Sequence, residues 1–424
     1  MIALFFMIFF FFCPTPLPLL GNLHTILAHE PGYDAFEMWR KQYGPVYTYW
    51  IGILPFVVVA DYKTMRETFV KDGDAYAGKF TIDEVTKDYR GGRYGVLDST
   101  GDMWREHRRF ALHVLKDLGL STNVMEQRVC GFAAVFCVSL SIACLSRLLF
   151  RKVTDLEEPI LQDCGSVHGI FFRNPPLLLI SFRLFFYRDA FFSFFDRQID
   201  AHQKQNDQEG DIATDYVAAF LKEQKRREAE GDYELFRHIQ LQNVCLDLWI
   251  AGMETTSNTL SWGVVYILNH LDVQMKMHEE MDREIGSSRA ITMTDKNYLH
   301  FTCAVVNEIQ RLGNIVPLNL LHETLRPVRI GGFDLPSKTG IVAQISTVLY
   351  DEEVFPDART FNPSRFIDES GKLKKVDEFI PFSIGKRQCL GEGLAKMELF
   401  LFIANLFNRF EALRSKEAVH IRRS

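Results

Sequence analysis

One short stretch near the end of the chain decides the fold, and it reads Phe382-Ser383-Ile384-Gly385-Lys386-Arg387-Gln388-Cys389-Leu390-Gly391. Apolar residues recur at helical spacing from Leu394 to Phe410, which predicts that Cys389 lies on a loop leading into the N-terminus of a helix. Backbone N–H groups and the helix dipole stabilise a thiolate at such a position. Gly385 permits a turn with positive φ, and Gly391 permits a close approach of the backbone to the sulfur. With Phe382 as a shield from water, the loop predicts a stabilised thiolate.

A lone cysteine is most often an ordinary buried residue, and that alternative holds for Cys389 taken by itself. The complete pattern Phe-x-x-Gly-x-Arg-x-Cys-x-Gly is far more specific. It resembles the cysteine loop of the haem-thiolate monooxygenases, the cytochrome P450 superfamily, and in particular its animal microsomal branch that oxidises drugs and fatty acids. The resemblance implies that Cys389 is the axial thiolate ligand of the iron of haem b, a strong electron donor. It also implies that Phe382, Arg387 and Gly391 belong to the haem-binding loop, with Arg387 holding a propionate.

A second motif lies in the long helix predicted from Glu234 to Met281, whose centre reads Ala251-Gly252-Met253-Glu254-Thr255-Thr256. Glycine and β-branched threonine are poor helix formers, and such exceptions inside a buried helix often mark a functional site. Ala251 and Gly252 leave space for a ligand, and the Thr255 hydroxyl can bond a carbonyl one turn back. Glu254 adds an acid, so that the pair suits proton delivery. The motif resembles the oxygen-activating helix of the superfamily, which implies that Glu254 and Thr255 are catalytic.

One further pair and one histidine resemble haem-binding residues of the superfamily. Trp104 and Arg108 lie on one face of a helix predicted from Gly101, a pattern that by itself is typical of a solvated basic helix. The resemblance implies that the pair holds a haem propionate, which arginine can bind in a bidentate way. His322, five residues after Pro317, resembles a propionate-binding histidine of the same branch, with a surface histidine as the alternative.

A charged trio is predicted to support the cysteine loop. Glu308 and Arg311 are three residues apart on a helix and can pair. An exposed pair of this kind contributes little stability. The superfamily buries the pair with a second arginine, which here is Arg365. Because removal of one member leaves a buried charge without its counterion, the role of the trio is structural.

The N-terminus resembles that of the microsomal members. Residues 1–13, MIALFFMIFFFFC, are predicted to be a hydrophobic anchor, although a helix of that length spans roughly 20 Å against a hydrocarbon core of ~30 Å. A basic n-region and a small-residue cleavage site, which mark a signal peptide, are missing. Residues 14–22 are rich in proline, which predicts a stiff, extended hinge. We expect residues 23–424 to form a single haem-binding catalytic domain at the endoplasmic reticulum membrane, on its cytoplasmic face.

Local patterns predict two further elements. The residues from Tyr43 to Val59 are predicted to form a two-stranded hairpin, because β-branched and aromatic residues are interrupted there by glycine and proline. A helix is predicted from Asp61 to Lys71 with Asp61 as its N-cap. The last residues, 412–424, are polar and basic, and they give no sign of the hairpin that the superfamily has near this position.

The resemblance covers residues 14–130 and 185–411 and is lost between 131 and 184, where we expect an irregular region. The uncharged stretch 129–146 fits a buried helix or a borderline membrane span. Three of its cysteines recur every seven residues, too far apart for ligands of one metal ion: Cys130, Cys137 and Cys144. The apolar residues 174–186 suit either the core or a loop dipping into a membrane surface. The alternative function is therefore a haem-binding but catalytically incompetent or truncated member.

Composition and motifs limit the classes of molecule that this protein is expected to bind. A net charge of −6 argues against nucleic acid, and eight cysteines without a C-x-x-C pair are typical of a reducing compartment. The chain carries no Gly-x-Gly-x-x-Gly fingerprint, so NADPH must be bound by a separate protein. The resemblance implies that this protein is a flavoprotein reductase, with cytochrome b5 as a further electron donor. Lys386 and Arg387 are expected to face such a partner.

The sequence thus predicts a mainly α protein (α+β) with the cytochrome P450 fold, in which haem lies between the long central helix and the helix after Cys389, beside a small β-sheet region. The resemblance implies a monooxygenase that inserts one oxygen atom from O2 into a lipophilic organic substrate, a fatty acid or a xenobiotic. A haem isomerase that needs no reductase is a further alternative, against which the Glu254–Thr255 pair argues. A structural membrane protein would rest on the apolar stretches alone.

Overall fold

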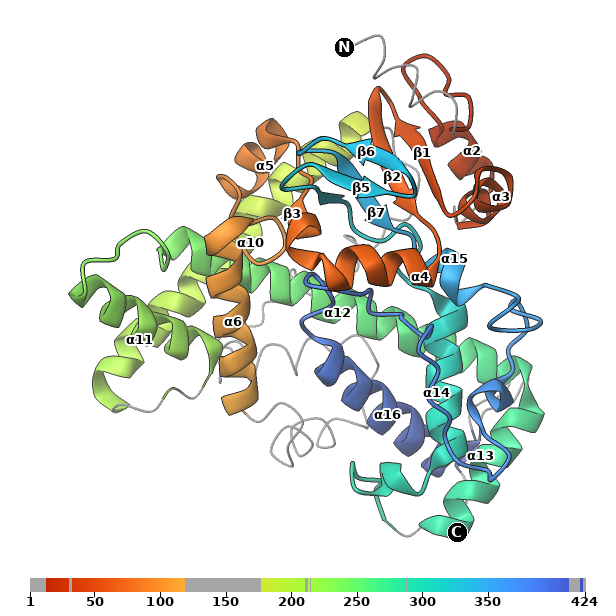
Figure 1. The fold of residues 1–424 in the computed structure, drawn as a ribbon. Coiled ribbons are helices and arrows are strands. Elements are labelled where there is room, and N and C mark those ends of the chain that lie inside the picture. Colours follow the sequence, from red (N-terminus) through yellow and green to blue (C-terminus); the bar gives the residue numbers. More distant parts are fainter. Residues whose placement is uncertain are drawn as a thin grey trace. The chain divides into compact units, whose positions relative to one another are not determined.

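The computed structural model describes residues 13–29, 33–118, 177–209, 213, 215–286, 289–411 and 420–421 (Figure 1). The chain divides into two compact units, each of which is described by itself. The first unit comprises Met1–Phe80, Trp262–Glu392 and Phe407–Ser424, and the second comprises Thr81–Ser261 and Gly393–Leu406. Helices predominate, and all strands of the described residues belong to the first unit. The predicted mainly α class with a small β region is confirmed.

The largest sheet of the described residues has five strands in the order β1-β2-β7-β4-β3. Its strands are β1 (Val46–Ile51), β2 (Leu54–Val59), β3 (Gly78–Lys79), β4 (His322–Glu323) and β7 (Gly340–Ala343). The hairpin predicted from Tyr43 to Val59 is confirmed by β1 and β2, which turn at Gly52 with a φ of 59°. Strands β2 and β7 are parallel, and the other neighbours are antiparallel. The sheet thereby pairs His322 with both Lys79 and Ile341.

The first unit also holds a small hairpin, β5 (Val328–Ile330) with β6 (Phe333–Leu335), and most of the short helices. These are α2 (Leu23–Ala28), α3 (Tyr33–Tyr43), α4 (Tyr62–Met65), η1 (Arg66–Lys71), η2 (Gly73–Tyr76), α13 (Leu271–Glu284), η3 (Asp295–Asn297), α14 (His300–Gly313), α15 (Ser346–Leu349) and η4 (Pro363–Phe366). The predicted N-cap of the helix after β2 is confirmed, because Asp61 Oδ1 accepts a hydrogen bond from Thr64 N at 2.9 Å. The α-helix widens at Arg66 into a π-helical turn.

A buried ion trio joins α14 to η4. Glu308 accepts two hydrogen bonds from Arg311, at 2.8 and 2.9 Å, and one from Arg365 Nε at 3.1 Å. The side chains of Glu308 and Arg311 are fully buried. The remaining donor of Arg311, Nη1, bonds Leu349 O at 2.7 Å, and Asn362 N donates to Glu308 at 3.0 Å. The predicted buried trio is confirmed.

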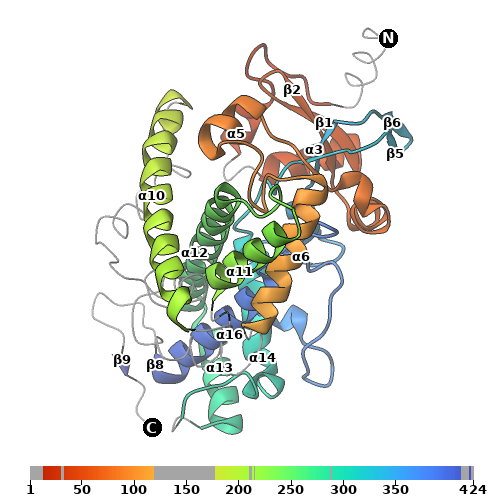
Figure 2. The same ribbon diagram turned by 90° about the vertical axis from the view of Figure 1, so that its left-hand side faces the viewer.

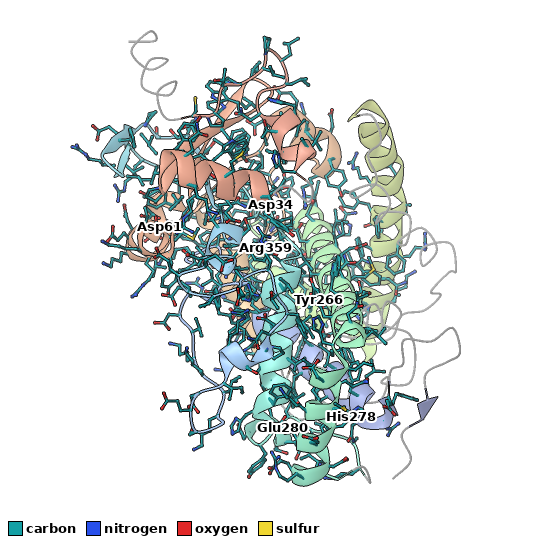
Figure 3. All side chains as sticks on the ribbon, turned by 90° about the vertical axis from the view of Figure 1, so that its right-hand side faces the viewer. Asp34, Asp61, Tyr266, His278, Glu280 and Arg359 are labelled. Carbon is teal, nitrogen blue, oxygen red and sulfur yellow. The ribbon has the colours of Figure 1, made fainter. Side chains whose placement is uncertain are left out.

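Two other charged residues fix neighbouring helices of the first unit (Figure 3). Arg359 binds Asp34 on α3 and lies 4.0 Å from the centre of the Tyr350 ring. Glu280 on α13 accepts hydrogen bonds from the backbone N–H of Thr302, at 2.8 Å, and of the residue before it. A carboxylate is well placed there because the first N–H groups of α14 have no partner within the helix.

Helices are the only regular secondary structure among the described residues of the second unit (Figure 2). It contains α5 (Asp83–Arg90), α6 (Gly101–Asp117), α10 (Leu177–Glu209), α11 (Tyr216–Ala229) and most of α12 (His238–Asn269) and α16 (Glu392–Arg409). Figure 2 shows α10 beside α12, and the rings of Phe194 and Phe195 pack edge-on against Trp249 between them. Asp215 caps α11 and binds His202 Nε2 at 2.6 Å, which ties α11 back to α10.

The predicted single helix from Glu234 to Met281 is wrong, because it is two helices, α12 and α13, separated at His270. In a continuous helix, the N–H of His270 would bond the carbonyl of Tyr266. Instead, His270 Nδ1 donates to Tyr266 O at 2.8 Å, and its backbone N–H bonds Ile267 O at 3.1 Å. The side chain therefore takes the place of the backbone donor, and the helix ends.

Two terminal expectations also need correction. The proline-rich residues 14–22 are not extended, because Leu17 and Gly21 exchange two backbone hydrogen bonds of 2.9 Å around a tight turn. The Asn22 side chain holds this turn by donating to Pro14 O at 3.1 Å. Near the other end, β8 (Phe410–Glu411) pairs antiparallel with β9 (His420–Ile421), a short hairpin that the composition of residues 412–424 did not indicate.

Several predicted segments lie outside the described residues. They are the anchor up to residue 12, the stretch 129–146 with its three cysteines, and most of the irregular region 131–184. The described part of the apolar run 174–186 is helical, since α10 begins at Leu177. No helix in the described parts of the chain is both long and apolar enough to cross a membrane.

Candidate active site

The cysteine loop lies where the sequence predicts, directly before α16. The Cys389 backbone N–H donates to Phe382 O at 3.0 Å, which closes the loop. Gly385 has a φ of 86°, and a Cβ there would lie 2.0 Å from Phe69 O, so that only glycine fits. Gln388 donates to Glu392 at 2.6 Å, which joins the loop to the first residue of α16.

Two expectations for this loop are wrong. The Cys389 side chain is exposed and Phe382 is half-buried, so Phe382 does not shield the sulfur. A Cβ at Gly391 would meet only Cys389 Sγ, at 4.0 Å, which is an ordinary contact distance. A Cβ atom at position 391 would therefore fit, and the distance between the protein chain and the sulfur does not require glycine there.

In the first unit, His322 lies beside the cysteine loop and Arg387 lies on it. His322 is 4% exposed, so the alternative of a surface histidine is wrong. Its Nδ1 lies 3.0 Å from Tyr76 O, and its ring packs edge-on against Phe69, the residue that contacts Gly385. Arg387 Nε donates to Ala77 O at 2.8 Å. The residues from 69 to 77 thus hold both predicted propionate ligands next to the cysteine loop.

The protonation of His322 follows from its surroundings. Burial, assisted by the charges of Lys79 and Arg387, lowers the pKa of His322 to about 3. A carbonyl can only accept, so Nδ1 carries the proton that bonds Tyr76 O, and Nε2 of the neutral ring is an acceptor. His322 would therefore hold a carboxylate at Nε2 only as the imidazolium, whose charge the carboxylate would itself stabilise.

In the second unit, the centre of α12 is open on one face. Ala251 is exposed and Thr255 is half-buried, although Met253 and Thr256 between and beside them are 3% exposed. Thr255 Oγ1 donates to Ala251 O at 2.6 Å, the predicted bond to a carbonyl one turn back. Glu254 is half-buried. The small residues and the acid–hydroxyl pair thus lie where the sequence places them, on an accessible part of a helix that is otherwise largely buried.

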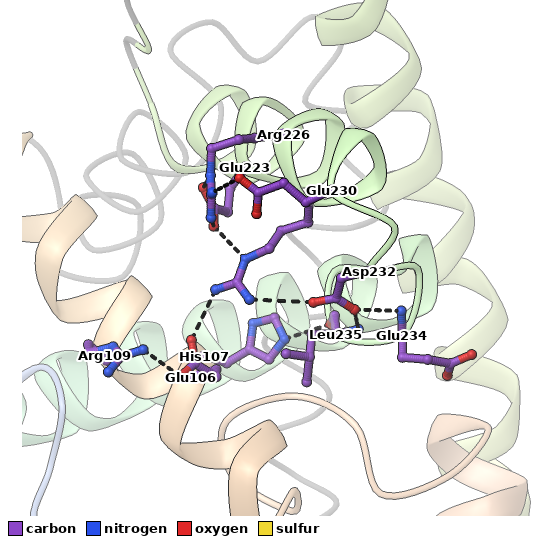
Figure 4. A network of polar contacts seen from close by, with 10 residues as sticks. Glu106, His107, Arg109, Glu223, Arg226, Glu230, Asp232, Glu234 and Leu235 are labelled. Atoms are coloured by element: carbon purple, nitrogen blue, oxygen red, sulfur yellow. Dashed lines mark hydrogen bonds and ion pairs between the residues drawn. The ribbon is translucent and has the colours of Figure 1, made fainter.

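Trp104 and Arg108 lie on α6, one turn apart. Trp104 is 4% exposed and Arg108 is half-buried, so the alternative of a fully solvated helix is wrong. A network of polar contacts fixes α6 (Figure 4). Arg227 of α11 binds Glu106 at 3.1 Å, and His107 Nε2 donates to Leu235 O at 2.8 Å. This network sets the position from which the Trp104–Arg108 pair projects.

A buried acid on α16 is a residue that the sequence reasoning missed. Glu398 is 3% exposed, and it accepts a hydrogen bond from Thr256 Oγ1 at 3.4 Å, directly beside Thr255 in the chain. Burial raises the pKa of Glu398 to about 8, which leaves a neutral carboxylic acid behind α12 at pH 7. A single acid inside the apolar run Met397-Glu398-Leu399-Phe400 was the available signal.

A second missed feature is the clamp between α12 and the residues before α6. Asp247 binds Arg90 Nη1 at 2.6 Å and accepts the backbone N–H of Val96 at 2.7 Å. Gln240, two turns earlier on α12, accepts the N–H of Gly95 at 2.8 Å and donates back to its carbonyl at 3.1 Å. Acceptor side chains at seven-residue spacing on α12 thus hold the backbone of the segment that leads to Trp104.

The predicted site residues fall into two sets. The first unit brings together His322, Phe382, Arg387, Cys389 and Gly391, and the second unit carries Trp104, Arg108, Glu254 and Thr255. The joint role of the two sets stays a prediction. Each set fits a haem by its own chemistry, because one offers an exposed thiol and a cation, and the other a cation and the exposed small residue Ala251.

Comparison with known proteins agrees with these features. The family model described as Cytochrome P450 matches residues 12–155 and 165–421. Cytochrome P450 2D26 of Rattus norvegicus is 34% identical over 94% of this chain and 86% of its own length. Cytochrome P450 2C11 of the same species and 2C5 of Oryctolagus cuniculus are 31% and 32% identical, over 94% of this chain and 85% and 87% of their lengths. The expected loss of resemblance between 131 and 184 is wrong, since most of that region matches.

Glu398→Gln should change how stability depends on pH. Above the ordinary carboxyl pKa of 4.5 the unfolded chain loses a proton that folded Glu398 keeps until about pH 8. The free energy of unfolding of the wild type should therefore fall as pH rises through this window, by at most about 1.4 kcal/mol per pH unit. Glutamine does not titrate, so the stability of the variant relative to the wild type should rise with pH. Denaturant midpoints across the window measure this, with exposed Glu84→Gln as control. A difference independent of pH would contradict the expectation.

Proposed function

The chain belongs to the cytochrome P450 family, and on this premise we propose that it inserts one oxygen atom from O2 into a lipophilic organic substrate, a fatty acid or a xenobiotic. The family consists of haem-dependent monooxygenases, which are oxidoreductases, and its cofactor is haem b with an axial cysteine thiolate. Its fold is the mainly helical one with small sheets described above. Substrate, redox partner and residue roles in this chain are our proposals.

Cys389 is the proposed axial ligand, and its loop is the observation that carries the proposal. The cysteine is exposed, its own N–H is held by Phe382 O, and α16 begins three residues later. Helix N-termini stabilise a thiolate. When bound, the haem supplies the oxygen chemistry, in which a thiolate ligand favours O–O cleavage.

The cations of the two units are the proposed partners of the haem carboxylates. Arg387 and Arg108 are half-buried, which strengthens a charge-assisted bond relative to one in bulk water. Trp104 is buried on the same helix, one turn before Arg108. His322 joins them in the imidazolium form. These four residues bind and orient the cofactor and take no part in the chemistry.

Glu254 and Thr255 are the proposed proton-delivery pair. The Thr255 hydroxyl gives its own proton to Ala251 O at 2.6 Å, which directs its lone pairs away from the helix axis. It can then accept a hydrogen bond from water or from protonated Glu254, and it can pass its own proton on when the bond to Ala251 O opens and the accepted proton replaces it. The exposure of Ala251 leaves room beside this hydroxyl for a small molecule.

The electron donor is proposed to be an NADPH-dependent flavoprotein reductase, with cytochrome b5 as a second donor. Lys386, whose side chain is 51% exposed, lies on the loop that carries Cys389 and makes only a 3.7 Å ion pair with exposed Asp74. A cation in this place suits an acidic partner surface, because rim charges steer association.

A membrane surface is the proposed lipid partner, and two turn tips support it. Leu19 is 83% exposed at the turn of residues 17–21, and Ile53 is 73% exposed at the β1–β2 turn. The tips adjoin, since Gly52 N donates to Leu20 O at 3.2 Å. We call Leu17, Leu19, Leu20 and Ile53 the lipid-facing tip. Residues 13–29 and 43–60 contain no Asp, Glu, Lys or Arg, so insertion would desolvate no charge. The endoplasmic reticulum membrane, at its cytoplasmic face, is the proposed location.

Cys389→Ser should abolish the strongly red-shifted Soret band of the reduced carbon monoxide complex, because serine offers no thiolate to the iron. The difference spectrum of the purified full-length chain measures this. Cys303→Ser, which alters a buried cysteine of α14, should keep the band. A band that survives in Cys389→Ser would exclude Cys389 as the ligand.

Thr255→Val should lower the product formed per NADPH consumed by at least roughly tenfold, against the roughly 10²–10⁴-fold of a complete general acid–base contribution. Valine keeps the shape and removes the hydroxyl. Thr259→Val is a matched control, because Thr259 Oγ1 also bonds the carbonyl one turn back, at 2.8 Å, but is buried. Product and NADPH are measured in the reconstituted system with a lipophilic test substrate. Equal losses in both variants would assign the effect to helix structure.

The double change Leu19→Asp and Ile53→Asp should lower the fraction of full-length chain that floats with phosphatidylcholine vesicles several-fold, since charged side chains are costly to insert. Met275→Asp changes an apolar residue of α13 that is 58% exposed, and it should have no effect. Haem content checks the fold of each variant. Unchanged flotation of the double variant would remove the lipid-facing tip from the proposal.

A further inference from the structure

Two residues other than glycine adopt left-handed backbone conformations and are bonded to each other in the first unit. Asn319, between α14 and β4, has a φ of 51°, and Ser383, on the cysteine loop, has a φ of 65°. The Asn319 side-chain amide donates to Ser383 Oγ at 3.1 Å. Such conformations persist only where the surroundings enforce them, and they gather at functional sites.

The side chain of Asn319 uses three of its hydrogen-bonding positions. Besides Ser383, the amide donates to Ala343 O of β7 at 2.6 Å, and Oδ1 accepts the N–H of Leu320 at 2.8 Å. Asparagine suits this place for two reasons, because it tolerates positive φ and carries two N–H donors. Aspartate would share the first property but would set a carboxylate oxygen against Ala343 O.

The bond reaches the cysteine through one neighbouring residue. Ser383 follows Phe382, whose carbonyl accepts the N–H of Cys389 at 3.0 Å. Ser383 N donates to Ile380 O at 3.0 Å, and Ile380 packs in the same core cluster as Ala343. Asn319 therefore fastens the start of the cysteine loop to the central sheet, opposite the end at which α16 begins.

We propose that Asn319 is a positioning residue for the thiolate, acting through Ser383 to set the position of the Cys389 loop against β7. The inference rests on the proposed role of Cys389 as the haem ligand. The number and direction of N–H groups near a ligating sulfur tune its electron donation, so the link should also set the reduction potential of the bound haem. The alternative is that Asn319 is a local fastener, a residue that stabilises only the turn from 316 to 320 through its bond to Leu320.

Three substitutions separate the bond from the backbone strain. Asn319→Gly keeps the left-handed conformation and removes the side chain, and Asn319→Asp keeps the shape and removes both donors. Ser383→Gly relieves the strain at Ser383 and removes only the acceptor. Lys338→Gly is the matched control, because Lys338 has a φ of 63°, is exposed, and lies outside the cysteine loop.

The first measurement is amide hydrogen exchange of residues 382–391 in the full-length chain, followed by mass spectrometry, with and without added haem. Both Asn319 variants should exchange at Cys389 at least roughly tenfold faster than the wild type, while Lys338→Gly should not. Asn319→Gly and Ser383→Gly combined should have less than the sum of their single effects, since both remove the same bond. Unchanged exchange at Cys389, with faster exchange confined to 316–320, would overturn the proposal in favour of the local fastener.

The second measurement is the reduction potential of the haem-loaded chain. It should shift in both Asn319 variants and stay constant in Lys338→Gly. If amide exchange at Cys389 becomes faster but the reduction potential does not shift, Asn319 does not influence the thiolate, and that part of the proposal is overturned. If the Cys389→Ser variant keeps the red-shifted band, Cys389 is not the haem ligand. The hydrogen-exchange experiment without haem would still decide whether Asn319 holds the loop.

Discussion

The carboxylate of Glu308 is the constraint on which the first unit depends. It is fully buried, and a buried charge without partners is so costly that its donors are obligatory. Arg311 binds it from the same helix, whereas Arg365 must be brought from more than fifty residues further along the chain. The residue after Arg365, Phe366, packs edge-on against Phe379, just before the segment that leads to Cys389. The buried carboxylate of Glu308 thus fixes the path of the chain toward Cys389. Loss of one of its two arginine partners would lower the free energy of unfolding by on the order of 3–5 kcal/mol.

The titratable groups near the predicted site divide into neutral and charged ones according to burial. His322 and Glu398 are each at least nine-tenths buried, and the pKa of each moves in the direction that removes its charge near pH 7. Arg108 and Arg387 are only half-buried. Near the predicted site residues, each unit therefore has one buried neutral group and one half-buried cation. That arrangement suits an apolar molecule with carboxylates at its edge, which is the description of a haem.

The elements that the sequence predicts correctly are those whose determinants are local. The hairpin from Tyr43 to Val59 follows from alternation and a glycine turn, and the Asp61 cap acts over three residues. The break at His270 could not be foreseen, because it depends on which carbonyl a side chain reaches. The roles of Glu398 and Asn319 depend on partners more than sixty residues away, Thr256 and Ser383. The family motifs identified the candidate site residues. The residues that position them can be identified only from the folded structure, in which distant segments of the chain come into contact.

The segment between α14 and β4 makes contacts at two fixed places. Asn319 reaches Ser383 and Ala343, and three residues later His322 reaches Tyr76. Three residues of extended chain span about 10 Å at most. The contacts of Asn319 and of His322 can therefore both form only at this spacing along the chain. Leu318 and Leu320 are 38% and 48% exposed, and their side chains take no part in these hydrogen bonds. Substitutions at Leu318 and Leu320 should therefore be tolerated, whereas insertion or deletion of a single residue between Asn319 and His322 would break one of the two contacts.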